Sequence, residues 1–225
     1  YIKIQDGCNQ FCSYCVIPYA RGRVRSRKEE NIIREIEGLA AAGHREAVLT
    51  GIHISSYGTD FAKEKGDSAS GGAGRLISLV ERIHEIPGLE RIRLGSLEPR
   101  AVTQEAARRL AALPKLCPHF HLSLQSGCDA TLKRMNRHYT AREYYQSVEY
   151  LREAFAEPAV TTDVIVGFPG ETEEEFECTK AFLEKTGFYE MHIFKYSRRA
   201  GTAADRMPGQ VPDQIKTRRS GELLE

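Results

Sequence analysis

Three cysteines near the start of the chain have a spacing that suits metal or cluster binding. Cys8, Cys12 and Cys15 lie in the stretch DGCNQFCSYCVIPYARG, in the pattern C-x3-C-x2-C, although the chain has only 6 cysteines in all. Thiolates that converge on one point can hold zinc or an iron–sulfur cluster. Because hydrophobic burial does not require this spacing, we interpret the three thiols as ligands rather than as core side chains.

Three ligands leave two chemistries open. A structural zinc site is closed by four ligands, and the sequence shows no second cysteine pair or histidine pair at zinc-finger spacing. A 4Fe–4S cluster held by three cysteines leaves one iron free for an exogenous chelating molecule, which accounts for the missing ligand. The other cysteines, Cys117, Cys128 and Cys178, are widely spaced, and we interpret them as structural or incidental thiols.

Strand-like and helix-like segments alternate along the whole chain. Short apolar or β-branched runs predict strands at 1–5, 46–50, 91–95, 119–124, 160–166 and 189–196. Helical periodicity predicts helices at 29–42, 76–86, 104–113, 141–155 and 172–185, the last with a capping box from Thr172 to Glu175. Repeated β–α units predict a single α/β domain with a parallel sheet, either an open doubly wound sheet or a partial barrel. Residues 60–74 are low in complexity, and we expect a mobile surface insertion there.

Polar or glycine-rich residues follow each predicted strand. They are the cysteine loop, TGIH at 50–53, GSLEP at 95–99, QSG at 125–127, GFPGET at 167–172 and YSRR at 196–199. The carboxyl ends of parallel strands form one rim, where ligands bind in α/β folds. The sequence therefore predicts one extended site on that rim.

Composition restricts the class of protein and its compartment. Lys plus Arg (32) nearly balances Asp plus Glu (31) in the 225 residues, so any nucleic-acid contact has to come from a local patch. No apolar run is long enough to cross a membrane, and YIKIQDGC lacks the regions of a signal peptide. We expect a cytoplasmic protein without membrane contact, where reducing conditions favour metal or redox chemistry over disulfides.

Several longer motifs together resemble a known enzyme family. The C-x3-C-x2-C loop, with the aromatic residue Tyr14 before its last cysteine, resembles the radical S-adenosylmethionine superfamily. The segments DGCNQFCSYCVIPYARGRVRSR, VLTGIHISSYG, LSLQSGCDATLKRMNRHYT, TTDVIVGFPGETEEEF and YSRRAGTAA resemble the methylthiotransferases in particular. The TGIH and YSRRAGTAA versions are most similar to the branch that acts on threonylcarbamoyladenosine beside the tRNA anticodon.

The resemblance implies a fold, cofactors and a reaction. The fold would be a partial (βα)6 barrel of the radical SAM type. Cys8, Cys12 and Cys15 would hold a 4Fe–4S cluster whose free iron binds S-adenosylmethionine, and one-electron reduction would cleave this cofactor to a 5′-deoxyadenosyl radical. The radical would serve methylthiolation at C2 of N6-threonylcarbamoyladenosine, whose unactivated C–H bond needs such a route. The implied partners are tRNA, a low-potential electron donor and a sulfur donor that the sequence does not identify.

The resemblance also implies which rim residues contact S-adenosylmethionine, and no residue is assigned as catalytic. The implied contacts are Tyr14, Thr50, Gly51, Ser96, Glu98, Gln125, Ser126, Arg137, Asp163, Ile165, Val166, Gly167 and Tyr196. Arginine suits the methionine carboxylate because its planar fork pairs bidentately. An aspartate in an apolar strand needs a partner, which a ribose hydroxyl, a backbone group or an arginine could supply. Plainer interpretations are a helix-start carboxylate for Glu98, a solvated cation for Arg137 and a turn glycine for Gly51.

A basic run follows the cysteine loop directly. Arg21, Arg23, Arg25 and Arg27, with Lys28, place 5 positive charges within 8 residues. Such a run can hold tRNA phosphates, although a charge run is more often a solvated face.

Domain content and protein class complete the expectations. Full methylthiotransferases also carry an N-terminal domain, whose second 4Fe–4S cluster delivers sulfur, and a C-terminal TRAM domain that helps bind RNA. We expect residues 1–225 to form the radical SAM core domain with neither of these. Alternative substrates within the same chemistry are isopentenyladenosine in tRNA and a ribosomal-protein aspartate. Two other classes stay open: a non-catalytic, zinc-stabilised RNA-binding module, and an electron-transfer cluster protein, which normally supplies four cysteines per cluster.

Overall fold

The computed structural model describes residues 1–61 and 72–224, so most of the insertion expected at 60–74 lies outside the described residues. The strands are β1 (Ile2–Lys3), β2 (Gln5–Asp6), β3 (Arg25–Ser26), β4 (Glu46–Thr50), β5 (Arg91–Leu94), β6 (His119–His121), β7 (Ala159–Val166) and β8 (Glu190–Lys195). The α-helices are α1 (Ile17–Ala20), α2 (Glu29–Ala41), α4 (Gly72–His84), α5 (Gln104–Ala111), α6 (Asp129–Arg134), α7 (Ala141–Ala154), α8 (Glu173–Thr186) and α9 (Asp213–Glu222). Short 3-10 turns are η1 (Ile54–Ser56), η2 (Pro99–Ala101) and η3 (Ala204–Arg206). In this described part, no helix has both the length and the apolar character needed to cross a bilayer.

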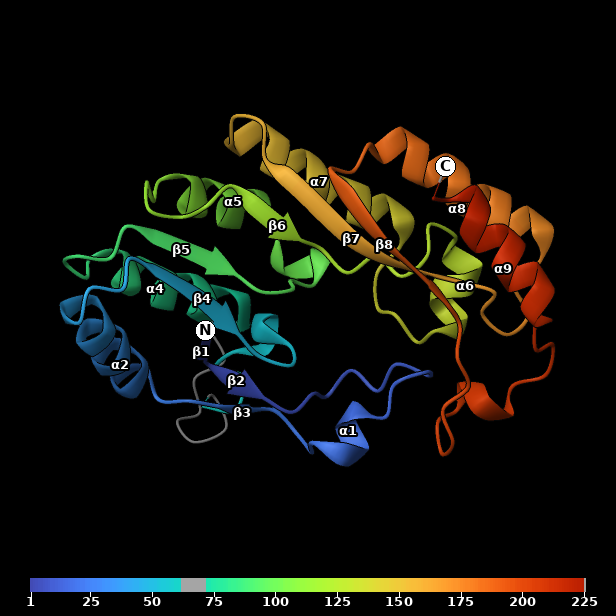
Figure 1. The fold of residues 1–225 in the computed structure, drawn as a ribbon, viewed down its shortest axis with the longest axis horizontal. Helices are drawn as coiled ribbons and strands as arrows, with labels where there is room; N and C mark the ends of the chain where they lie inside the picture. Colours follow the sequence, from blue (N-terminus) through green and yellow to red (C-terminus); the bar gives the residue numbers. More distant parts are fainter. Residues whose placement is uncertain (62–71, 225) are drawn as a thin grey trace.

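Six strands run parallel in the order of the sequence. Ladders join β1 to β4 and β5, and β6 to β7 and β8, while the bridges Ile92–Leu116 and Leu97–Leu122 connect the two halves. A doubly wound sheet reverses its strand order at a switch point, whereas a barrel keeps one direction. The strand order therefore decides for the partial barrel, and the predicted fold class is confirmed. Within the described residues β1 and β8 share no ladder, so the barrel is open on one side (Figure 1).

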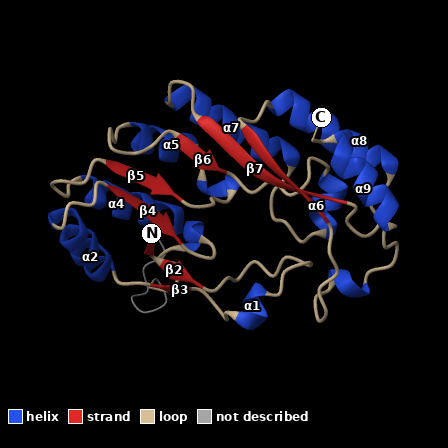
Figure 2. Cartoon of the chain, in the orientation of Figure 1, coloured by secondary structure: helices blue, strands red, loops and turns tan. Residues whose placement is uncertain are grey.

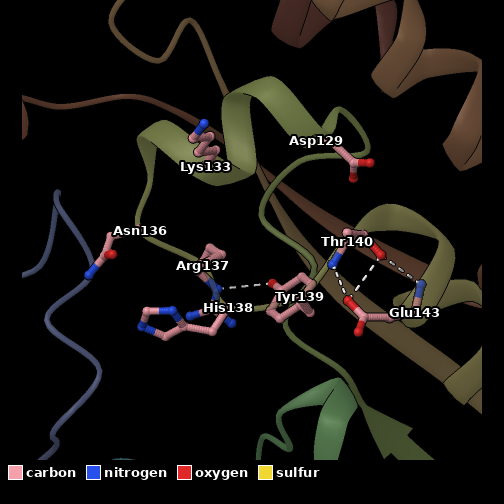
Figure 3. Close-up of a pocket in the computed structure, with 8 residues that line it drawn as sticks. All are labelled: Asp129, Lys133, Asn136, Arg137, His138, Tyr139, Thr140 and Glu143. Atoms are coloured by element: carbon pink, nitrogen blue, oxygen red, sulfur yellow. Dashed lines mark hydrogen bonds between the residues drawn. The ribbon is translucent and has the colours of Figure 1, made fainter.

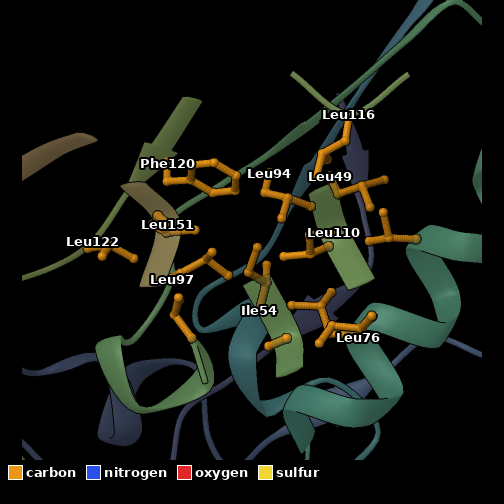
Figure 4. Close-up of a cluster of buried hydrophobic side chains, with 14 of the residues drawn as sticks. Leu49, Ile54, Leu76, Leu94, Leu97, Leu110, Leu116, Phe120, Leu122 and Leu151 are labelled. Carbon is orange, nitrogen blue, oxygen red and sulfur yellow. The ribbon is translucent and has the colours of Figure 1, made fainter. Parts of the chain in front are cut away.

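Helices cover the outside of the curved sheet. Going around it, α2 contacts α4, α4 contacts α5, α5 contacts α7, and α7 contacts α8 (Figure 2). Between sheet and helices lies a large apolar core, in which Leu49, Leu94 and Phe120 of the strands meet Leu76 of α4 and Leu110 of α5 (Figure 4). Each of these side chains is at most 4% exposed. Because burying one such side chain contributes about 1.5–3 kcal/mol, the core holds the strands in register and thereby positions their carboxyl ends.

Helices α7 and α8 both begin with capping boxes. The Thr140 hydroxyl accepts a hydrogen bond from the backbone of Glu143, whose side chain bonds back to the Thr140 backbone. Thr172 and Glu175 make the same pair at the start of α8, as the sequence predicted. These reciprocal bonds satisfy backbone N–H groups that a helix start leaves unpaired, which is why the local sequence alone could indicate the boundary.

The structure contains α1, β3 and α9, which were not predicted, and it differs from the sequence prediction in three further elements. The first predicted strand divides into β1, which joins the barrel, and β2, which pairs antiparallel with β3. The fourth ends at His121, and the chain beyond it makes only single bridges to the neighbouring strands. Helix α6, with 6 residues, was not predicted because so short a helix shows too little periodicity to recognise.

Candidate cluster and cofactor site

The loop that carries the three cysteines is held from two sides. Cys8 N donates to Gly22 O at 3.1 Å, which closes the loop on its own chain. Residues directly after α6 hold it from across the barrel mouth: Ser13 N donates to Met135 O at 3.0 Å, and Asn136 Nδ2 donates to two loop carbonyls at 3.0 and 3.3 Å. Folding of the second half of the barrel therefore shapes the cysteine loop.

Gly7 allows the loop to begin. Its φ is +71°, and a Cβ at this position would lie 1.9 Å from Arg23 O. Only glycine fits both the left-handed backbone and the close approach of β2 to the chain before β3.

The three thiols line one pocket of about 160 Å³ and are half-buried. Cys8 Sγ accepts a hydrogen bond from Gln10 N at 3.4 Å, and Cys12 Sγ accepts one from Arg137 Nη1 at 3.3 Å. Burial raises the pKa of the Cys8 and Cys15 thiols, so bound metal has to displace their protons. The two N–H donors favour the thiolates that result. This donor set fits a thiolate-ligated cluster.

Side chains from the cysteine loop itself and from other parts of the barrel complete the same pocket. Five of them were implied by the sequence resemblance: Tyr14, Ser96, Glu98, Gln125 and Arg137. The pocket also contains six residues to which the sequence assigned no role: Gln10, Ile17, Ile52, His53, Leu97 and Ser123. His53 follows a predicted strand within TGIH, so its position was a signal that could have been used. Gln10 and Ser123 carried no comparable signal.

Glu98 lies among polar groups at the edge of the thiol pocket. Its Oε2 accepts a hydrogen bond from Gln10 Nε2 at 3.1 Å and lies 3.3 Å from His53 Nε2. Burial acts to raise the pKa of Glu98, but His53 and the charge of Arg137 outweigh it, so the pKa lies below its usual range. The Glu98 side chain makes no capping bond to η2, which does not support its plainer interpretation as a helix-start carboxylate.

Arg137 is tied into the pocket rather than solvated. Its guanidinium contacts Cys12 Sγ, donates from Nε to Tyr139 Oη at 3.0 Å and donates from Nη2 to Ser123 O at 3.3 Å. Figure 3 shows the bond to Tyr139 from an outer pocket that lies between α6 and the start of α7. Burial acts to lower the pKa of Arg137, but Tyr139, Tyr14 and Cys12 outweigh it and raise the pKa, so the side chain stays charged.

A second pocket adjoins the first and shares Tyr14 and Gln125 with it. Asp163, Ile165 and Tyr196 line this second pocket, as the resemblance implied, together with residues of the β8 end. Gln125 has a φ of +71°, a backbone conformation that side-chain-bearing residues rarely adopt. Tyr196 Oη is buried and has no hydrogen-bond partner among the described residues, so a bound ligand could satisfy it.

Five residues implied as cofactor contacts line neither pocket: Thr50, Gly51, Ser126, Val166 and Gly167. Ser126 Oγ lies 3.1 Å from Thr179 Oγ1 of α8, and Val166 is 1% exposed in the core. A Cβ on Gly51 would lie 2.9 Å from Gln5 O, so glycine is required there for backbone packing. Thr50 and Gly167 likewise make their contacts to neighbouring parts of the chain, Thr50 Oγ1 at 3.4 Å from a β1 carbonyl.

Asp163 has two histidine partners. His192 Nδ1 lies 3.2 Å from Asp163 Oδ1, and His121 Nε2 lies 3.3 Å from Oδ2. Burial acts to raise the pKa of Asp163, but the two histidines outweigh it and lower the pKa. The partners that make this carboxylate tolerable in an apolar strand are therefore imidazoles, which the sequence alone did not indicate.

The basic run is partly neutralised. Asp6 pairs with Arg21 at 2.6 Å and lies 3.7 Å from Arg25, while Arg27 pairs with a glutamate of α2 at 2.6 Å. Arg23 lies over an aromatic ring of the cysteine loop, 4.5 Å from its centroid. Arg25, at 61% side-chain exposure, is the most accessible of the three ion-paired arginines.

The three remaining cysteines lie outside both pockets. Cys128 is buried at the start of α6, Cys117 is half-buried, and Cys178 is exposed on α8.

The family profile of the Radical SAM superfamily matches residues 2–183. This range includes the cysteine loop and the strands from β1 to β7. The chain belongs to the Radical SAM superfamily. Members of this superfamily hold a 4Fe–4S cluster and S-adenosylmethionine, so membership implies both groups. The half-buried thiols, with N–H donors directed at two of the sulfur atoms, fit the cluster. Tyr196 Oη, a buried polar atom without a partner among the described residues, fits a bound polar cofactor.

Curated relatives of this radical SAM chain are tRNA-modifying enzymes. It is 45% identical over 224 residues to a tRNA-2-methylthio-N(6)-dimethylallyladenosine synthase of Caldicellulosiruptor saccharolyticus, covering 100% of this chain and 46% of the relative. It is 43% identical over 225 residues to the threonylcarbamoyladenosine tRNA methylthiotransferase MtaB of Chlamydia pneumoniae, covering 100% of this chain and 51% of the relative. The chain thus spans about half the length of the curated relatives it matches. Relatives named for two different nucleosides have nearly the same identity to this chain.

Solved structures show the same fold. The radical S-adenosylmethionine methyltransferase TsrM of Kitasatospora setae superposes with a TM-score of 0.70 at 22% identity, over 91% of this chain and 38% of TsrM. Coproporphyrinogen III oxidase (HemN) of Escherichia coli superposes with a TM-score of 0.63 at 14% identity, over 99% of this chain and 52% of HemN. At these identities the likeness concerns the fold alone.

Proposed function

We propose that this chain is the radical SAM core of a tRNA methylthiotransferase that acts at C2 of N6-threonylcarbamoyladenosine. The observation that carries the proposal is that Cys8, Cys12 and Cys15 share one pocket with Glu98, which follows β5, and Arg137, which follows α6. The identity of 42–45% to curated tRNA methylthiotransferases supports the reaction class.

Two segments support the threonylcarbamoyladenosine branch. TGIH and YSRRAGTAA are the versions that resemble this branch, and both segments reach the candidate site. His53 of the first lines the thiol pocket, and Tyr196, Ser197 and Arg199 of the second line the adjoining pocket. The competing proposal has isopentenyladenosine as its substrate, which is the nucleoside called N(6)-dimethylallyladenosine in the names of the relatives. Relatives with this name are equally similar to the chain.

The residues of the thiol pocket suit the polar end of S-adenosylmethionine. When bound, the cluster and this cofactor supply the one-electron chemistry that produces a 5′-deoxyadenosyl radical. Beyond its bonds to Cys12 and Ser123, Arg137 keeps one N–H on each terminal nitrogen for a carboxylate, and Glu98, ionised because its pKa is lowered, suits an ammonium group. The apolar side chains of Ile17, Ile52 and Leu97 line the same pocket and exclude water from it.

The adjoining pocket suits the nucleoside end of the cofactor. Ile165 and Tyr196 present an apolar and an aromatic surface, which fits a purine ring, and Tyr196 Oη has an unused hydrogen-bonding capacity. Tyr14 and Gln125 belong to both pockets, so one extended molecule can occupy both.

The same proposal includes the partners and the second cluster of the whole protein. It would use tRNA, a low-potential electron donor and a second 4Fe–4S cluster that delivers sulfur. The basic run beside the cysteine loop, Arg21, Arg23, Arg25 and Arg27, would contact the RNA backbone.

The test compares two RNA substrates under anaerobic conditions. The full-length protein with reconstituted clusters receives S-adenosylmethionine, a low-potential reductant and tRNA that carries either threonylcarbamoyladenosine or isopentenyladenosine. Mass spectrometry of the digested RNA should show methylthiolation of the threonylcarbamoyl nucleoside alone, together with 5′-deoxyadenosine. Cys12→Ala should produce neither.

Each of the other possible outcomes would contradict one part of the proposal. Methylthiolation of isopentenyladenosine alone would move the chain to the sister branch. Cofactor cleavage without modification of either RNA would leave the radical chemistry but reject these tRNA substrates. A colourless protein that binds zinc at the three cysteines and no iron would favour the RNA-binding module instead.

A further inference from the structure

Two histidines and an aspartate meet on the inner face of three adjacent strands. His121 of β6, Asp163 of β7 and His192 of β8 each offer a ligand atom, and these atoms all lie within 4.8 Å of one another. Asp163 is paired in register with His192. Phe120, next to His121 in β6, and Val164, next to Asp163 in β7, are fully buried in the core. Because successive side chains of a strand point to opposite faces, the three polar side chains face away from the core, into the barrel.

The two histidine–carboxylate distances within this His–Asp–His cluster match those between ligands of one metal ion. His121 Nε2 is 3.3 Å and His192 Nδ1 is 3.2 Å from the Asp163 carboxylate oxygens. Two ligands bound to tetrahedral zinc at about 2.0–2.1 Å are about 3.3–3.4 Å apart. The imidazole rings are stacked, with centroids 6.0 Å apart and planes 25° apart, so both present their edges to the same carboxylate.

Each histidine has a polar group near its other ring nitrogen, and the group beside His121 is within hydrogen-bond distance. His121 Nδ1 contacts Thr161 Oγ1 at 3.0 Å, and His192 Nε2 lies 3.7 Å from Glu190 Oε1. Metal-ligating histidines usually hold the other ring nitrogen with a hydroxyl, carbonyl or carboxylate in this way. The arrangement leaves His121 Nε2 and His192 Nδ1 directed at Asp163.

The His–Asp–His cluster is accessible from the candidate cofactor site. The side chains of His121, Asp163 and His192 are 14%, 30% and 51% exposed. Asp163 lines the second pocket, together with Ile165 and Tyr196. An ion here would therefore lie on the wall of that pocket, apart from the three cysteines.

We propose that His121, Asp163 and His192 form a binding site for a late first-row divalent metal ion, best matched by zinc. Two imidazole nitrogens and a carboxylate oxygen supply three ligands of a tetrahedral ion, and the fourth position is open toward the second pocket. That position suits an oxygen donor, such as a carboxylate or hydroxyl of a molecule bound in the pocket. The proposal does not depend on which RNA is the substrate.

The test is zinc binding by the full-length protein with its clusters in place, so that the cluster cysteines are already ligated. Anaerobic equilibrium dialysis against buffered zinc, with zinc and iron counted by plasma mass spectrometry, should show one zinc bound per chain. The variant His192→Ala should bind zinc at least tenfold more weakly than the unmodified protein. Iron content should not change. His44→Ala, in an exposed turn after α2, is the matched control and should bind zinc as the unmodified protein does.

X-ray absorption identifies the ligands of the bound zinc. A first shell of nitrogen and oxygen at about 2.0–2.1 Å supports the site, whereas sulfur at about 2.3 Å would assign the zinc to cysteines and overturn it. Asp163→Asn, which keeps the side-chain shape, is the second variant and should also weaken binding at least tenfold. Zinc binding that is unchanged in both variants would show that the His–Asp–His cluster is only a hydrogen-bonded group.

Discussion

At the scale of residues, the candidate site consists of contacts between positions far apart in the chain. Arg137 reaches the Cys12 sulfur across 125 residues, and Gln10 reaches Glu98 across 88. Arg137 uses all three nitrogens of its guanidinium, on Cys12, on a tyrosine hydroxyl and on a carbonyl. A lysine has the charge but not the planar fork, so it could not replace these contacts together.

Glu98→Gln should separate cofactor binding from cluster assembly. The substitution keeps the shape of the side chain and removes the negative charge that we assign to the cofactor's ammonium group. We expect the Kd for S-adenosylmethionine to rise about tenfold or more, which corresponds to about 1.4 kcal/mol or more, with iron content unchanged. Equilibrium binding to the cluster-loaded protein measures this. Glu105→Gln, exposed on α5, is the control, and an unchanged Kd for Glu98→Gln would reject its role.

At the scale of elements, α6 connects the cysteine loop to the second half of the barrel. Arg134, the last residue of α6, binds both carboxylate oxygens of Glu175 in the first turn of α8. Arg134 O also accepts a hydrogen bond from Ser13 Oγ of the cysteine loop at 2.8 Å. The ion pair between two helices therefore fixes the residue that holds the loop.

Glu175→Gln should lower stability at neutral pH and reduce its acid sensitivity. The hydrogen bonds from Arg134 lower the pKa of Glu175 in the folded state. A lowered pKa stabilises the fold above the carboxyl's unfolded-state pKa, and this contribution is lost as pH falls through the folded-state value. Because the pair is partly exposed, we expect a loss of about 1 kcal/mol at pH 7.

Denaturant titrations at pH 7 and at acidic pH measure this effect. The difference between the variant and the unmodified protein should shrink as the pH falls below the carboxyl's unfolded-state pKa. Glu177→Gln, exposed on the same helix, should show no such trend. A difference that stays constant with pH would mean that Glu175 acts through packing or capping alone.

At the scale of the whole molecule, the final helix holds the turn that follows β7. Helix α9 packs on β7 and β8, beyond the residues matched by the family profile. Arg219 of α9 is buried and donates from Nη1 to Glu171 Oε1 at 2.7 Å. The same carboxylate oxygen accepts a hydrogen bond from Gly167 N at 2.9 Å, so α9 fixes the GFPGET turn after β7.

Arg219→Ala should destabilise the protein strongly. It leaves the buried carboxylate of Glu171 without its cation, which typically costs about 3–5 kcal/mol. The double variant Glu171→Gln, Arg219→Ala has the same packing at position 219 but no unpaired carboxylate, so it should be more stable than Arg219→Ala. Urea denaturation of the three proteins tests this. If the double variant is no more stable than the single one, lost packing rather than the unpaired charge explains the effect.

The basic run should contribute to RNA affinity through charge. Arg25 is exposed and close to the cysteine loop, so Arg25→Ala should weaken tRNA binding and reduce the slope of log K against log salt by about 0.7–0.9. Filter binding at several salt concentrations measures the slope. Arg142→Ala, exposed on α7, is the control for a change in total charge. Equal slopes for both variants would show that Arg25 lies outside the RNA contact.

Local sequence predicted most of the element types but not the arrangement of the site. Apolar periodicity indicated β4, β5, β7, β8 and five of the longer helices, because one buried face repeats with a fixed period in each. Polar residues at strand ends predicted a shared rim, and the rim contains both pockets. Val166 and Ser126 show the limit of this reasoning. Val166 ends β7 but faces the core rather than a pocket, since a one-residue step along a strand reverses side-chain direction. Ser126 lies in the loop beyond β6, where its hydroxyl contacts Thr179 of α8.

The sequence by itself determined that three cysteines share one loop, that β–α units repeat and that α8 begins with a capping box, because each depends on residues near one another in the chain. The tertiary structure alone decided that the strands follow one order around a partial barrel. It also decided that Arg137 meets Cys12, and that Asp163 meets His121 and His192. These depend on strand order and register, which are set by packing between distant segments and leave no signature in any short stretch of sequence.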